Sequence, residues 1–319
     1  MTTTTQDPRL AAIRARSSRA KRSLPPLTPK LATGLLIAGS IILFGIFGPL
    51  FVGDPRAVDN VGLAGPAEGY LLGTTQTGQD VFAQLAYATR GSLTVGLIVG
   101  VLTLFLSAFF GIIGAYFGGW LDESFSLFSN VMLVIPGLPL VIIISSYVPE
   151  KSLLLVAVVL SITGWAGSAR VLRGFTLSVR NRDYVAAARV SGENSLRILG
   201  VEILPNLIPL LASQVVFAVI FAILGEAGLS FLGLGAADSF TWGTMLYFAQ
   251  NGLALRLGAW WWFVPPGLLI ALFGAALALI NFSIDEIINP KLRSQTRSSR
   301  KSWKISKSEL RDANKESAL

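Results

Sequence analysis

The stretch that decides the fold is "DYVAAARVSGENSLRILGVEILPN", residues 183–206, a charged and helix-like segment in an apolar chain. Asp183 can cap the start of a helix over Tyr184–Val190, because its carboxylate accepts hydrogen bonds from the free N–H groups there. Gly192 then supplies the positive φ that the end of a helix commonly needs. The first half of the stretch therefore predicts a short helix that ends in a glycine turn.

The second half predicts another short helix, over Leu196–Val201, that leads into a hydrophobic span. Asn194 or Ser195 can cap this helix, and Pro205 suits the first turn of the span that follows. Helix, turn, helix and span then form one hairpin. A charged hairpin of this kind needs an explanation in a chain whose other long segments are hydrophobic.

The composition points to a membrane protein. Of 319 residues, 52% are hydrophobic and 14% are charged, whereas soluble domains carry about 25% charged residues. The sequence has no Cys and no His, so thiol nucleophiles, imidazole bases and the usual zinc sites are excluded. We therefore expect no catalytic residues, no metal site and no bound cofactor.

Six windows lack Asp, Glu, Lys and Arg and are long enough to cross a bilayer as helices, which takes roughly 17–25 residues. The expected fold is all-α, a polytopic membrane protein with six transmembrane helices. The windows are Leu31–Gly53, Gly91–Leu121, Ser124–Pro149, Ser152–Ala169, Ile203–Gly225 and Leu257–Ile284. The third contains "VIPGLP", in which Pro136 and Pro139 break the helical hydrogen-bond ladder, so we expect a kinked helix.

The positive charges give the expected orientation. With the N-terminus inside, the cytoplasmic segments hold 22 of the 26 Lys and Arg residues, and the outer segments hold four. Since cytoplasmic loops carry the excess of positive charge, both termini are expected in the cytoplasm, and the net charge of +8 needs no nucleic acid partner. The expected order is a basic tail (1–30), the first span (31–53), an extracytoplasmic segment (54–90), a core of five spans (91–284) with an inner hairpin (170–202) and an outer loop (226–256), and a second basic tail (285–319).

The spans themselves argue against an ion-coupled carrier, which normally needs ionisable groups near the midplane. Asn130 and Gln214 are candidates to line a polar translocation path, although hydrogen bonds between helices are the more common use of such groups. Glu226, at the outer end of the fifth span, is a third candidate, with a structural hydrogen bond as its alternative. In the outer loop, Trp242 suits the membrane boundary.

The hairpin also has the features of a docking element. Ala186, Ala187 and Ala188 are small and allow close approach of another surface, and Arg189 adds positive charge beside them. Such a helix suits insertion into a groove of a partner protein. The alternative is an interfacial helix whose arginines meet the phosphates of membrane lipid.

Several motifs in order resemble the permeases of ABC importers. "AAARVSGENSLRILGVEILP" resembles their Glu-Ala-Ala loop, and three further pieces resemble the dipeptide, oligopeptide and nickel subfamily in particular. These are "LLGTTQTGQDVFAQLAYATRGSL" (71–93), "GAYFGGWLDE" (114–123) and "GEAGLSFLGLG" (225–235) followed by "TWGTML" (241–246). The closing "INPKLR" (288–293) also fits.

Three residues depart from the family pattern. Ala186 stands where the family has its first Glu, and Thr75 and Gln79 stand where the family has Asp and Arg. In such permeases this Glu would make a hydrogen bond or salt bridge with a partner ATPase, and Ala186 cannot make it. The residues that shape the hairpin are present.

The resemblance implies the fold of a type I importer permease in a bacterial plasma membrane. It implies four partners of three kinds: a homologous second permease, two cytoplasmic ATPase subunits and an extracytoplasmic substrate-binding protein. The hairpin (183–205) would couple to the ATPase through Asp183, Ala186, Ala187, Ala188, Arg189, Gly192 and Pro205. The chain has no G-x-x-x-x-G-K-[ST] phosphate loop of its own, so it is expected not to be an enzyme. The alternative function is an ATP-independent carrier or channel with six spans.

Overall fold

The computed structural model describes residues 28–58, 62–67, 69–148 and 151–288, and within them the regular elements are helices. Most of both expected basic tails lies outside the described residues. The helices are α2 (Pro29–Phe51), α3 (Val81–Ala108), the π-helix η1 (Phe109–Ile113), α4 (Gly114–Phe117), α5 (Gly119–Val134), α6 (Gly137–Tyr147), α7 (Leu153–Arg180), α8 (Asp183–Val190), α9 (Ser195–Arg197), the π-helix η2 (Ile198–Ile203), α10 (Leu204–Phe231), α11 (Trp242–Asn251) and α12 (Trp260–Ile288).

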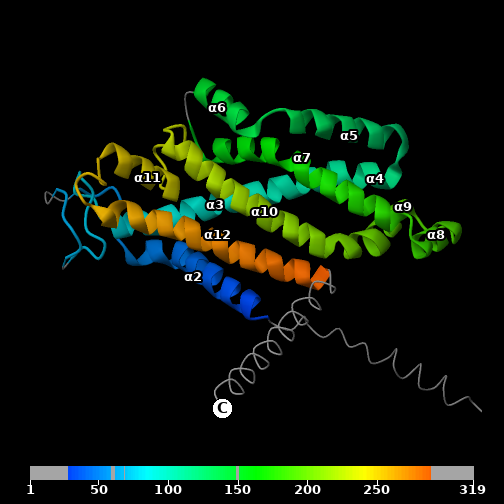
Figure 1. Cartoon of the computed structure of the whole chain (residues 1–319), viewed down its shortest axis with the longest axis horizontal. Coiled ribbons are helices and arrows are strands. Elements are labelled where there is room, and N and C mark those ends of the chain that lie inside the picture. The colour runs from blue at the N-terminus through cyan, green and yellow to red at the C-terminus, as the bar shows by residue number, and fades with distance from the viewer. Residues whose placement is uncertain (1–27, 59–61, 68, 149–150, 289–319) are drawn as a thin grey trace, which may run out of the picture.

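Five helices of the described chain are long and apolar enough to cross a membrane, and they run side by side along the long axis of the molecule (Figure 1). These are α2, the continuous helix from α3 to α4, α7, the continuous helix from α9 to α10, and α12. Several exceed the windows expected from the sequence: α3 begins at Val81 and α7 continues to Arg180. Helical hydrogen bonding continues through charged residues at the membrane surface, whereas a charge-free window stops at the first of them.

The expected third span differs most from the sequence-based expectation. Instead of one kinked helix it is the pair α5 and α6, with a bend of 83° between them, so a sixth span exists only if this pair counts as one. Ile135 and Pro136 have extended backbone at the break. Proline lacks the N–H that would continue the ladder and disfavours helical φ/ψ in the residue before it. The position of the break was predicted correctly, and its angle was not.

Small residues let the long helices approach one another closely. A Cβ on Gly111 would lie 2.5 Å from the backbone oxygen of Ala169, and a Cβ on Gly34 would lie 2.8 Å from that of Ala276. These contacts join η1 to α7 and α2 to α12. Close packing at small residues is the usual source of helix association in lipid, because apolar burial alone gives no advantage there. A buried hydrogen bond of 2.6 Å from Ser213 to Asn281 adds a polar link between α10 and α12.

The two ends of the bundle carry different structures. The hairpin of α8 and α9 lies at one end, and α11 with the loops that precede α3 and α12 lies at the other (Figure 1). At the α11 end, Trp242 is fully buried and its indole N–H donates to Thr89 on α3 at 3.0 Å. The ring of Trp242 is therefore a packed part of the bundle and does not face lipid, and its position at the membrane boundary stays a prediction.

Candidate functional site

The first candidate site is the hairpin of α8, α9 and η2, residues 183–203. Its turn has the hydrogen bonds of a Schellman motif: Gly192 N–H donates to the Arg189 carbonyl at 3.0 Å, and Glu193 N–H donates to the Ala188 carbonyl at 3.1 Å. Gly192 has a φ of 76°, in the left-handed region expected from the sequence. The turn thus satisfies carbonyl groups that the end of α8 would otherwise leave unpaired.

Helix caps in the hairpin agree with the sequence in part. Asn194 accepts a hydrogen bond from Leu196 N–H at 3.2 Å and so caps α9, and Pro205 lies in the first turn of α10. Asp183, by contrast, is inside α8, and the N-cap position belongs to Arg182, whose side chain makes no capping bond. The carboxylate of Asp183 still lies in the first turn, where it interacts favourably with the helix dipole.

The second helix of the hairpin is shorter than expected. Instead of an α-helix over Leu196–Val201, three α-helical residues pass directly into η2 and then into α10 without a break. A π-helix has one extra residue in its turn, and such segments occur frequently at functional sites. The hairpin is consequently a direct continuation of a membrane-spanning helix.

An apolar cluster fixes the hairpin to the rest of the bundle. Val185 of α8 and Ile198 and Ile203 of η2 are buried together against Leu172 of α7 and Tyr116 of α4. Packing of this density transmits displacement, because interiors have low compressibility. A movement of α8 is therefore expected to move the spans that contain α4, α7 and α10.

Two arginines add polar contacts to this attachment. The guanidinium of Arg189 lies 5.7 Å from the ring centroid of Tyr116, within cation–π range. Arg180, at the end of α7, donates to the Ala115 carbonyl at 2.8 Å. Both contacts are made to residues of α4. They therefore attach α8 and the end of α7 to α4.

The side of the hairpin away from its buried residues is exposed. Ala186, Ala187 and Gly192 are exposed, and Ala188 is half-buried. Val190 is 89% exposed and Leu196 is 70% exposed. Small and apolar groups thus form the tip, and the exposed arginines Arg182, Arg189 and Arg197 surround it. Apolar groups surrounded by arginines suit a groove of a partner protein or the phosphates of membrane lipid, the two alternatives expected from the sequence.

The three residues proposed from the sequence for a translocation path lie in different surroundings. Asn130 accepts a hydrogen bond from Arg170 at 2.6 Å and borders a cavity of about 310 Å³ between α5, η1 and α7. Gln214 is half-buried on α10. Glu226 is buried, and its Oε1 accepts from Ser230 at 2.6 Å and Thr241 at 2.7 Å. The structure does not bring these residues together, and a path role for each stays a prediction.

Glu226 has a structural task in this arrangement. Its carboxylate oxygen and the N–H of Thr244 both bond to the Thr241 hydroxyl, and Thr241 and Thr244 form the capping box that begins α11. Glu226 therefore ties the end of α10 to the start of α11. In this conformation the carboxylate thus makes the structural hydrogen bond that the sequence analysis gave as the alternative to a path role.

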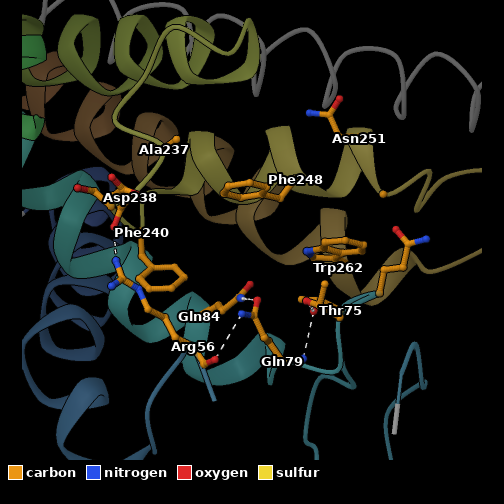
Figure 2. Close-up of a pocket in the computed structure, with 14 residues that line it drawn as sticks. Arg56, Thr75, Gln79, Gln84, Ala237, Asp238, Phe240, Phe248, Asn251 and Trp262 are labelled. Carbon is orange, nitrogen blue, oxygen red and sulfur yellow. Dashed lines mark hydrogen bonds between the residues drawn. The ribbon is translucent and has the colours of Figure 1, made fainter. Parts of the chain in front are cut away.

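A second site, which the sequence did not single out, lies at the opposite end of the bundle. It is a pocket of about 510 Å³ between the 54–84 segment, residues 237–240, α11 and the start of α12 (Figure 2). Thr75, Gln79, Gln84 and Asn251 line it together with aromatic rings. The only sequence signal for it was the motif around Thr75 and Gln79, because the other walls come from distant parts of the chain.

Comparison with known proteins agrees with the fold and with the motifs of the hairpin. Residues 107–294 match the family profile described as binding-protein-dependent transport system inner membrane component. The chain is 34% identical over 270 residues to the oligopeptide transport system permease protein OppC of Bacillus subtilis, covering 83% of this chain and 87% of the relative. It is 33% identical over 273 residues to the dipeptide transport system permease protein DppC of the same organism, covering 83% of each chain.

Among solved structures, a chain of the MetNI methionine ABC transporter in an inward facing conformation is similar in fold. The TM-score is 0.51 at 17% sequence identity, and the match covers 64% of this chain and 94% of that chain. The fold is thus that of an ABC-importer permease, as the sequence predicted.

The chain is a multi-pass inner-membrane permease. It belongs to the family of binding-protein-dependent transport system inner membrane components, and within it to the peptide ABC transporter permeases.

Proposed function

We propose that this chain forms one half of the translocation path of an ATP-driven importer for peptides. Its partners are a homologous second permease, two cytoplasmic ATPase subunits and an extracytoplasmic binding protein. The peptide substrate is supported by the relatives, whose names specify oligopeptide and dipeptide transport. The chain itself acts as a transport subunit, and the ATPase subunits carry out hydrolysis.

The hairpin (183–205) is the coupling element in this proposal, and it lies on the cytoplasmic side. The observation that carries the proposal is its combination of an uncovered tip with a buried base: Val190 is 89% exposed, whereas Val185 is fully buried. Such an element can seat in a cleft of an ATPase subunit and move the attached spans as one body. Ala186 replaces the family Glu and is exposed, so the fit of small side chains, rather than a carboxylate, makes the contact.

The transport cycle follows from this arrangement. ATP binding closes the ATPase pair, the hairpins move with it, and the spans change from inward-open to outward-open. The binding protein then delivers its peptide, and hydrolysis resets the path. The ATP-bound ATPase must favour one permease state by a few kcal/mol, because only a difference in affinity for two states can shift their populations.

The test is uptake of a labelled peptide into proteoliposomes that contain the purified complex and the binding protein. We expect co-purification of the chain with nucleotide-binding subunits and uptake that requires ATP. ATP-independent uptake by the chain alone, with no nucleotide-binding subunit in the preparation, would show instead that it is a secondary carrier or channel.

A further inference from the structure

The pocket at the α11 end of the bundle has the size of a small-molecule site. Its volume of about 510 Å³ lies within the range of roughly 300–1,000 Å³ that ligand pockets occupy. In Figure 2 the side chains of Gln84, Phe248 and Trp262 converge on the same space from three separate elements. The pocket lies within one chain and at the opposite end from the hairpin, so it is separate from the coupling element.

The walls of the pocket combine aromatic faces with neutral hydrogen-bonding groups. Phe240, Phe248 and Trp262 supply the aromatic surface, and Gln79, Gln84 and Asn251 supply carboxamides. A carboxamide offers two donors and one acceptor. Gln84 Nε2 already donates to the Gln79 side-chain oxygen and to the Pro55 carbonyl, so the Gln84 oxygen is the group that would accept from a peptide N–H. Aromatic faces suit the apolar side chains of such a peptide.

One donor in the wall is unused by the chain. The indole N–H of Trp262 is buried and has no hydrogen-bond partner among the described residues. Buried donors are nearly always paired, and leaving one unpaired costs about 1–3 kcal/mol. In Figure 2 the edge of the ring that carries this nitrogen is turned toward Phe248 and Gln84. A ligand carbonyl that reaches this edge would remove that cost.

The polar groups are held in place before any ligand binds. Gln84 donates to the Gln79 side-chain oxygen at 2.8 Å, and Gln79 N–H donates to the Thr75 hydroxyl at 3.1 Å (Figure 2). The Thr75 N–H in turn donates to the Gln79 carbonyl at 2.9 Å. Groups that are already ordered lose little entropy on binding, which favours affinity.

Two residues in this network are the ones that depart from the family motif. Where the motif has Asp and Arg, this chain has Thr75 and Gln79, so the wall lacks that pair of opposite charges. The charged groups that remain at the pocket are Arg56 and Asp238, beside each other at one end (Figure 2). The Arg56 guanidinium donates to the Asp238 carbonyl, which leaves the Asp238 carboxylate without an ion pair among the described residues. A neutral wall with a charged end suits a ligand that has a neutral backbone and places one charged terminus at that end.

We propose that this pocket binds a short peptide through the backbone carbonyl and amide groups of the ligand. The Asp238 and Arg56 end receives a charged terminus of the peptide, and the aromatic rings receive its side chains. The choice of peptide as ligand rests on the proposed transport function. The site itself would be a peptide-binding site on the permease, in addition to the one on the separate binding protein.

The experiment measures equilibrium binding of radiolabelled tri-alanine to the purified permease–ATPase complex without its binding protein. The variant is Asn251→Leu, which removes a carboxamide from the pocket at an exposed position. The matched control is Gln250→Leu, because Gln250 is the exposed neighbour on α11 and does not line the pocket. We expect the wild type and the control to bind equally and Asn251→Leu to bind about fivefold to tenfold more weakly, the effect of about 1 kcal/mol per hydrogen bond.

A second variant, Trp262→Phe, keeps the ring and removes the unused donor, and it is also expected to weaken binding. Equal binding by the wild type and both variants, or no binding of tri-alanine by the wild type, would overturn the proposal. ATP-driven uptake by the same wild-type complex is measured separately. If the wild-type complex takes up peptide but the pocket variants bind tri-alanine as the wild type does, the pocket site alone is rejected. If the wild-type complex shows no ATP-driven uptake, the transport function is rejected.

The last arm identifies the occupant directly. The photo-crosslinker p-benzoylphenylalanine replaces Phe248, and the complex is irradiated with labelled tri-alanine and the binding protein present. A cross-link to tri-alanine supports the proposal. A cross-link only to the binding protein would show that the pocket is part of a docking surface for that protein and would overturn it.

Discussion

At the scale of single residues, Gly192 is the position on which the hairpin turn depends. Its φ of 76° lies in the left-handed region, and apart from its chain neighbours no atom of the described residues lies within 4 Å of where a Cβ would be. A substitution there is therefore strained by its backbone alone, and the cost differs among residue types. Asn tolerates the left-handed region, whereas a β-branched residue does not.

We accordingly expect Gly192→Val to reduce both peptide uptake and substrate-stimulated ATPase activity severalfold, since the turn loses about 1–2 kcal/mol. Gly192→Asn is expected to retain most of both activities. The two variants are compared in proteoliposomes at equal amounts of assembled complex. Wild-type uptake and ATPase stimulation in Gly192→Val would contradict a coupling role for the turn.

Gly73 tests a different residue-scale requirement, close approach of the backbone at the pocket end. Its φ is 69°, and a Cβ would lie 2.5 Å from the Ala64 carbonyl oxygen. Gly73→Ala is expected to destabilise the protein by about 2 kcal/mol or more, read as a lower Tm in detergent. Gly62→Ala is the control, because Gly62 has a similar φ of 65° but, among the described residues, nothing within 4 Å of where its Cβ would be. Equal Tm values for the two variants would show that the contact at Gly73 does not matter.

Residue-level prediction from sequence worked where the chemistry is local. The cap at Asn194, the turn at Gly192 and Pro205 in the first turn of α10 each depend on a few neighbours in the chain, and the structure has all three. The burial of Trp242 was not predicted, because it involves contacts with distant residues such as Thr89, which is 153 positions away in the sequence. One sequence does not show which distant residues meet.

At the scale of elements, the hairpin divides into a buried base and an exposed tip, and the two parts have different tasks. Val185→Ala removes two methylene-sized groups from the base, about 1.5 kcal/mol of apolar burial. We expect this variant to retain its ATPase subunits on purification and to show less uptake per ATP hydrolysed, because α8 is then loosely attached to the spans.

Val190→Asp changes the tip instead and introduces a charge into the proposed contact. It is expected to lower the amount of ATPase subunit that co-purifies, because an unpaired charge in a protein interface is costly. Co-purification is quantified for both variants against the wild type. If Val185→Ala loses the ATPase while Val190→Asp keeps it, the assignment of base and tip is wrong.

Elements were predictable in position more than in number or shape. The charge-free windows located each long helix, because a bilayer requires an apolar length. The 83° bend between α5 and α6 was not predictable. Pro136 tells where the backbone hydrogen bonds stop, but α5 and α6 both pack against α7, and one sequence does not show such long-range packing. The continuous helix from α9 through η2 into α10 was not predicted either, because a π-helix has no sequence signature of its own.

At the scale of the whole molecule, the hairpin lies at one end of the bundle, and α11, which borders the pocket, lies at the other (Figure 1). The proposed orientation puts the hairpin in the cytoplasm and α11 outside. Because the chain has no Cys, single cysteines report on the two ends without a background. We expect a membrane-impermeant maleimide to label Gln250→Cys from outside intact cells and Ser191→Cys only in inverted vesicles. Labelling of both positions from the same side would contradict the orientation.

The peptide pocket shows the limit of whole-molecule prediction from sequence. Its walls come from the 54–84 segment, residues 237–252 and Trp262, which are far apart in the chain and meet only when the bundle forms. Family motifs marked two of its residues, Thr75 and Gln79, but did not show that they border a cavity.

The most direct test of the coupling role is a cross-link from the tip of the hairpin. Val190→Cys carries a photoreactive benzophenone in the assembled complex, where the rest of this chain has no other thiol. Because Val190 is 89% exposed in the isolated chain, the probe reports on whatever covers it. We predict that irradiation joins this chain to the ATPase subunit. If irradiation gives no cross-link between this chain and the ATPase subunit, in a complex that transports peptide normally, the account is contradicted.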